Sequence, residues 1–142
     1  MATFNKFQDF SEQLTRGTQN FGTDTYKVAL SNSAPLATNT ILSDITQITA
    51  ANGYTSGGTA TTITVSETSG TTTVSGTQVV FTATGGSIGP FRYVVLYNDT
   101  TASPNKPLVG WWDYGSSITL ADTETFTVKF SNATPGAIFT LT

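Results

Sequence analysis

The amino-acid sequence predicts a mainly β protein, an antiparallel β-sandwich or jelly-roll-like fold with a short N-terminal helix. Threonine, which is β-branched and poor in helices, occupies 30 of the 142 positions. Short runs of alternating apolar and polar residues follow one another, separated by Gly, Pro, Asn and Asp. A parallel α/β sheet would need a helix between consecutive strands, and the second half of the chain offers none.

The N-terminal segment is the one place where a helical period is clear. Its large apolar residues advance by three, three and four positions, at Phe4, Phe7, Phe10 and Leu14. Thr3 can cap the start of this helix and Gly17 can end it. We expect the stripe either to cover the protein's own β core or to dock on a neighbouring subunit, in which case Phe4, Phe7 and Phe10 are the partner-contact residues.

The period changes to two after this segment. A first strand is predicted over residues 26–30, and helical spacing of isoleucines and leucine predicts a short helix between residues 39 and 48, capped by Asn39 or Thr40. The Thr-rich segment 59–76 is expected to form edge strands or a mobile hairpin. Further strands are predicted at residues 60–66, 71–75, 78–84, 91–98, 107–113, 117–120, 124–130 and 137–141.

Strands 91–97 and 108–114 flank a turn-rich loop and are expected to form an antiparallel hairpin. A symmetric register would set Arg92 opposite Asp113 as a structural ion pair. The same register sets Tyr93 opposite Trp112, Val94 opposite Trp111 and Val95 opposite Gly110. One face would then carry Phe91, Tyr93, Val95, Tyr97, Trp112 and Tyr114, and the other Arg92, Val94, Leu96, Val109, Trp111 and Asp113.

Adjacent side chains of a strand leave opposite faces, so Trp111 and Trp112 cannot share one platform. One of the two indole rings is therefore expected in the core. Only the other would be free for solvent, a ligand or a partner.

The size and composition indicate one domain over residues 1–142, with an arm at 1–17 and a β core at 18–142. The net charge of −3, with six basic residues spread along the chain, argues against nucleic acid as a partner. No apolar run is long enough for a signal peptide or a membrane span, so no membrane contact is expected.

The absence of His and Cys removes the usual nucleophile triads and zinc sites. Two carboxylate pairs could in principle serve a glycosidase, Asp113 with Asp99 and Asp122 with Glu124. We expect structural roles for them, hence a non-enzymatic protein without catalytic residues, metal or cofactor. Two functions remain open: a carbohydrate-binding or adhesion module using Trp111 or Trp112, and a structural assembly protein.

Four stretches carry a resemblance to a family. They are residues 4–7 (FNKF), 27–35 (KVALSNSAP), 87–98 (SIGPFRYVVLYN) and 110–117 (GWWDYGSS). Together they resemble small virion proteins of tailed bacteriophages. The resemblance implies a capsid decoration or cement protein that contacts the major capsid protein. It also implies a homo-oligomer, with a trimer favoured, in the virion after synthesis in the host cytoplasm.

Overall fold

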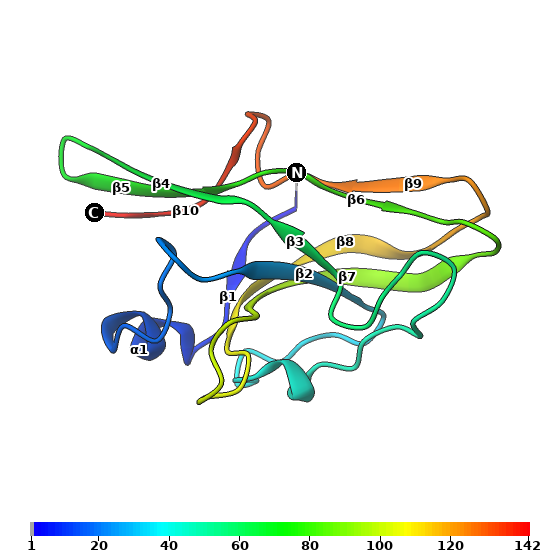
Figure 1. Cartoon of the computed structure of the whole chain (residues 1–142), viewed down its shortest axis with the longest axis horizontal. Helices are drawn as coiled ribbons and strands as arrows, with labels where there is room; N and C mark the ends of the chain where they lie inside the picture. Colours follow the sequence, from blue (N-terminus) through cyan, green and yellow to red (C-terminus); the bar gives the residue numbers. More distant parts are fainter. Residues whose placement is uncertain (1) are drawn as a thin grey trace.

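The computed structural model describes residues 2–142 and confirms a mainly β, antiparallel, sandwich-like fold in two layers (Figure 1). Met1, the first residue of the predicted arm, lies outside the described residues. The larger layer is a five-stranded main sheet. Its order is β1 (Asn5–Lys6), β8 (Leu108–Leu120), β7 (Ile88–Asn98), β2 (Tyr26–Ser31) and β3 (Thr59–Thr61).

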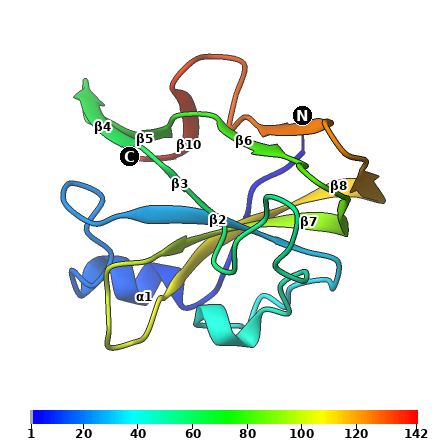
Figure 2. The same cartoon turned by 45° about the vertical axis from the view of Figure 1, so that its right-hand side comes forward.

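The second layer consists of two smaller sheets that lie end to end above the main sheet (Figure 2). The three-stranded sheet has the order β10 (Gly136–Leu141), β5 (Thr71–Gly76) and β4 (Ile63–Thr68). The two-stranded sheet pairs β6 (Val79–Thr82) with β9 (Thr125–Val128). Only residues 77 and 78 separate β5 from β6, so the same chain segment runs through both sheets.

The main sheet is buried on both faces. Toward the second layer it contributes Val28, Leu96 and Trp112 to an interior that also holds Phe81 and Phe130. On its other face a smaller cluster is formed by Phe7, Ala29, Leu42, Ile45, Val95, Tyr97 and Leu108. Apolar side chains on both sides of one strand explain why β2 and β7 read as nearly continuous apolar runs.

The predicted N-terminal helix is wrong over its first half. The helix α1 spans only Phe10–Thr15, and Asp9, not Thr3, stands at its N-cap. The preceding residues form β1, in which Asn5 lies opposite Trp111 of β8. Backbone pairing with an open strand edge therefore decides the conformation here, and the three-residue spacing of phenylalanines arises without a helix.

The second predicted helix is also wrong in extent, because residues 39–48 contain a single 3₁₀ turn at Leu42–Asp44. The Asp44 carboxylate accepts hydrogen bonds from the backbone N–H groups of Thr40 and Ile41, at 2.9 and 3.3 Å. Leu42 and Ile45 pack beneath the main sheet. One turn is enough to bury both side chains.

The strands of the second half lie close to their predicted positions, with two differences. Predicted segments 107–113 and 117–120 are one 13-residue strand, β8, which passes through Gly115 at φ +101°. The predicted strand 60–66 is divided, because β3 belongs to the main sheet and β4 to the second layer. The chain crosses between the layers at Thr62.

The predicted hairpin of β7 and β8 is present, but its register is offset by one residue. Tyr93 lies opposite Asp113, Val94 opposite Trp112, Val95 opposite Trp111 and Leu96 opposite Gly110. Irregularities occur between Phe91 and Tyr93 and between Leu96 and Tyr97. A bulge adds a residue to one strand and shifts everything beyond it, which a symmetric register cannot anticipate.

Candidate functional site

The two tryptophans lie on opposite sides of the main sheet, as predicted. Trp112 is 8% exposed and packs between Phe4 and Phe130, with ring centroids 5.3 and 5.4 Å away. Trp111 is half-buried on the other face, 4.6 Å from Phe7. The ring left partly outside is therefore Trp111.

The predicted membership of the two faces is wrong in part. Phe91 lies with Val94, Leu96, Val109 and Trp112 in the interior between the layers. Val95 and Tyr97 lie with Trp111 on the opposite face. The offset register places Trp112 opposite Val94, and the irregularities between Phe91 and Tyr93 and between Leu96 and Tyr97 move Phe91 and Val109 to the same face.

Arg92 and Asp113 form the predicted ion pair, although they are not directly opposite each other. Arg92 donates from Nε and Nη2 to the two carboxylate oxygens at 2.7 and 2.9 Å. The guanidinium also lies 5.5 Å from the centre of the Tyr93 ring. Hydrogen bonds from Arg92 and from the Gly115 N–H hold the pKa of Asp113 below its usual range. This geometry is that of a structural pair at a bulge, since both carboxylate oxygens are occupied.

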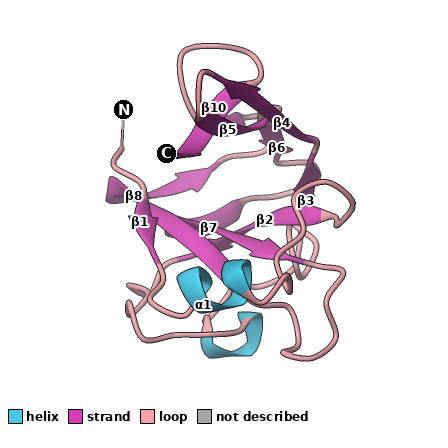
Figure 3. Cartoon of the chain, turned by 90° about the vertical axis from the view of Figure 1, so that its left-hand side faces the viewer, coloured by secondary structure: helices cyan, strands magenta, loops and turns pink. Residues whose placement is uncertain are grey.

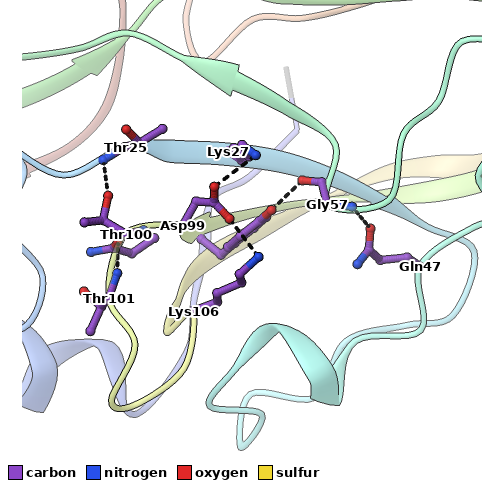
Figure 4. Close-up of polar contacts among 10 residues, drawn as sticks. Thr25, Lys27, Gln47, Gly57, Asp99, Thr100, Thr101 and Lys106 are labelled. Carbon is purple, nitrogen blue, oxygen red and sulfur yellow. Dashed lines mark hydrogen bonds and ion pairs between the residues drawn. The ribbon is translucent and has the colours of Figure 1, made fainter.

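The other carboxylates considered for catalysis also have structural partners. Asp122 accepts a hydrogen bond from the Gly85 N–H at 2.8 Å, and Glu124 accepts one from the Ala121 N–H at 3.2 Å. Asp99 lies between two lysines, 3.0 Å from Lys27 Nζ and 3.0 Å from Lys106 Nζ (Figure 4). That the protein is not an enzyme stays a prediction.

The surroundings of Asp99 form a polar network that the sequence reasoning missed. Its partial burial raises the pKa of the carboxyl, but Lys27 and Lys106 outweigh this and hold the pKa below its usual range. The preceding residue, Asn98, is fully buried, and its side-chain oxygen accepts from the N–H groups of Thr100 and Thr101. The signal was present in the sequence, because Asn followed by Asp and Thr is typical of a turn closed by side-chain hydrogen bonds.

A separate set of hydrogen bonds fixes the loop at residues 47–57 against Tyr97 of the main sheet. The Tyr97 hydroxyl donates to the Gly57 carbonyl at 2.6 Å, and the Gly57 N–H donates to Gln47 Oε1 at 2.7 Å (Figure 4). Tyr54 also donates to Gln47 Oε1, at 2.9 Å. Because these polar groups satisfy one another, they hold this loop in place, as the contacts of Asn98 and Asp99 hold the loop that follows β7.

The predicted contact residues of the N-terminal segment are used within the chain. Phe7 is fully buried on the outer face of the main sheet, and Phe10 is 3% exposed. Phe4 is half-buried and stacks on Phe139 of β10, with centroids 6.3 Å apart. Contact of these three rings with a partner stays a prediction, but Phe7 is fully buried and Phe10 leaves only 3% of its surface exposed.

Figure 3 shows the three-stranded sheet at the top of the view and α1 at the bottom. An apolar cleft lies between α1, the loop that follows it and the three-stranded sheet. One part, of about 700 Å³, is bounded by β1, α1 and β10, and Phe4 and Phe10 form part of its wall. The adjoining part, of about 420 Å³, lies between the loop at 17–22 and strands β4 and β5. Both parts share the side chains of Leu14, Phe139 and Leu141.

The wall of this cleft carries little chemistry. Lys6 is the one charged residue among those that line it, and its ammonium donates to the Ser11 hydroxyl. Small-molecule sites usually combine an apolar wall with several convergent polar groups. Among residues 2–142 no group of three or more His, Cys, Asp or Glu side chains could hold a metal ion. The cleft is therefore suited to apolar protein surface.

A smaller apolar pocket of about 180 Å³ lies at the other end of the sandwich, near β9. Its wall includes Trp112, Tyr114 and Phe126. The ring of Trp112 is 8% exposed and packs against Phe4 and Phe130. Trp112 therefore does not provide this pocket with the open flat ring that stacking on a sugar requires.

Comparisons of this chain with protein-family models, with curated proteins and with solved structures find no match. None of the helices in residues 2–142 has the length and apolar character needed to cross a membrane. The candidate site is thus defined by its own geometry, an apolar cleft in an antiparallel β-sandwich.

Proposed function

We propose that this chain is a non-enzymatic virion structural protein, which decorates and stabilises a bacteriophage capsid through multivalent protein contacts. The observation that carries the proposal is the apolar cleft between α1 and the three-stranded sheet. Exposed apolar surface of this extent, beside unpaired strands, is typical of protein interfaces.

The choice of a virion comes from the sequence resemblance. The four stretches that carry it belong to β1, β2, β7 and β8 and their flanking residues. These four strands are consecutive neighbours in the main sheet. The resemblance thus concerns one continuous structural unit, which supports a shared fold better than scattered matches would.

The proposed partners are the major capsid protein and further copies of this chain, with a trimer favoured. A capsid presents many identical sites, so a symmetric oligomer can engage several of them at once. Linked contacts raise overall binding by a factor on the order of 10² to 10⁴ without any single deep interface. The low charge and the Thr-rich surface suit broad contacts of this kind.

The alternative of a carbohydrate-binding or tail-fibre module gains no support from the tryptophans. Trp112 is enclosed between two phenylalanines, and Trp111 packs on Phe7. Neither ring stands free on the surface as a platform.

The test is binding of the purified chain to capsids of the phage that encodes it, prepared without the protein. We expect saturable co-sedimentation with the capsids and a higher temperature of capsid disruption. Binding to tails or fibres but not to capsids would overturn the capsid assignment. Retention on a glycan array that is lost in Trp111→Ala, in a variant that remains folded, would favour the carbohydrate alternative.

A further inference from the structure

The three-stranded sheet ends on both sides in a long unpaired strand. Strands β4 and β10 have six residues each, and each pairs only with β5. By contrast, the edge strands of the main sheet, β1 and β3, have two and three residues. Proteins usually protect long edges with Lys, Pro or a bulge. Neither Lys nor Pro occurs in β4 or β10, and the one bulge lies near the start of β10, at Ile138.

The unpaired edges carry exposed apolar side chains beside the cleft. Val65 of β4 is 45% exposed and Leu141 of β10 is 57% exposed, and both line the cleft. An added strand along β10 would form backbone hydrogen bonds with that edge. Its inward side chains would cover Leu14 and Phe139.

We propose that the occupant of this edge is a second copy of this chain, which adds its own β4 to the free edge of β10. Strand β4 has the alternation that the position requires, because Ile63, Val65 and Glu67 share one face. Val65 already faces the cleft of its own subunit. The inner face of the added strand is therefore apolar except at Glu67.

Charge complementarity supports the second copy. Lys6 is the one charged residue on the cleft wall, and no carboxylate within residues 2–142 pairs with it. Glu67 is the one charged residue of β4. When β4 of a second copy lies along β10, its apolar face covers the cleft. Its Glu67 then supplies a carboxylate for the Lys6 ammonium of the first copy.

The contact joins two different surfaces of the same chain, so it is heterologous and generates a closed ring of three or more subunits, or an open filament. It identifies the surface behind the oligomer in the proposed function. Its measurement uses purified protein alone, so it can fail or succeed independently of capsid binding. If the chain oligomerises through this edge but does not bind capsids, only the proposed virion role is overturned.

The first experiment measures mass in solution by sedimentation velocity for the full chain and two matched variants. Val65→Lys places a charge in the proposed contact between β4 of one copy and β10 of the next, which is called the seam below. The control, Val80→Lys, places the same charge on β6, at a valine that is similarly exposed (46%). We expect wild type and Val80→Lys to form species of three or more subunits. Val65→Lys should weaken association by roughly tenfold or more, because the added charge would be buried in the seam. A monomeric or strictly dimeric wild type, or equal effects of both variants, would overturn the proposal.

The second experiment uses the absence of cysteine in the chain. Lys6→Cys and Glu67→Cys are prepared separately, mixed and oxidised. We expect a disulfide-linked pair that contains one copy of each variant, and far less of it when Val80→Cys replaces Glu67→Cys. Cross-linking that is equal in the two mixtures would contradict the proposed seam.

Discussion

The main sheet and the three-stranded sheet differ in how far their strands are covered by the rest of the chain. The main sheet is covered on one face by the second layer and on the other by Phe7 and the turn that carries Leu42 and Ile45. The three-stranded sheet extends beyond this protection, and most residues of β4 are exposed (Figure 1). We therefore expect the main sheet to supply most of the folding stability and the edges of the three-stranded sheet to bind a partner. A region with few buried contacts contributes little to folding and is free to bind.

The largest expected effect of a substitution is in the outer cluster of the main sheet. Phe7→Ala removes a fully buried ring that packs on Trp111. We expect a loss of about 3 to 5 kcal/mol in the free energy of unfolding, measured by urea denaturation. Val65→Ala in the three-stranded sheet should cost less than about 0.5 kcal/mol. Similar losses in both variants would remove the contrast between the two sheets.

Two glycines with left-handed backbones, one beside the main sheet and one in the three-stranded sheet, test the same difference in packing. A Cβ on Gly58, at φ +75°, would overlap the carbonyl oxygen of Val28 in β2, whereas a Cβ on Gly70, at φ +83° in the β4–β5 turn, meets nothing within 4 Å. Gly58→Ala should therefore cost about 3 kcal/mol or more, since strand and loop must separate. Gly70→Ala should cost about 1 kcal/mol, from backbone strain alone. Thermal unfolding of the two variants measures the difference, and equal shifts would show that contact with β2 is unimportant.

An effect smaller than those of Phe7→Ala and Gly58→Ala is expected for Asp99, and it depends on pH. The folded protein lowers the pKa of this carboxyl below its ordinary value of 3.8, so its contribution is present above about pH 4 and is lost as the pH falls through the lower, folded value. Asp99→Asn should cost about 1 kcal/mol at pH 7, because the carboxylate is partly buried between two lysines. The gap between variant and wild type should narrow as the pH falls below about 4. A gap that is unchanged between pH 7 and pH 2 would show that the ion pairs do not contribute.

The placement of the strands could be predicted because it depends on local pattern. Alternation at residues 26–30 and the glycines and asparagines between later segments were sufficient to place most strands close to their observed bounds. The separation of Trp111 from Trp112 followed from the pleat of a strand, which holds for any partner. Opposite charge was enough to predict the pair of Arg92 and Asp113, although the register behind it was wrong.

The cleft could not be predicted from any local pattern. Its wall combines Leu14 of α1 with Phe139 and Leu141 of β10, which lie at opposite ends of the sequence and meet only in the folded chain. The same holds for the network around Asp99, where Lys27 and Lys106 approach from opposite directions along the chain.

The sequence by itself determined the β class, the turns and the alternation of side chains, because these depend on residues within one or two positions of each other. The tertiary structure alone decided the first half of the N-terminal segment and the hairpin register. Phe4 and Phe7 have helical spacing, yet β1 pairs with β8 and sends the two rings into different clusters. Pairing energy and burial are gained from distant strands, and they outweigh the weak preference of a short helix.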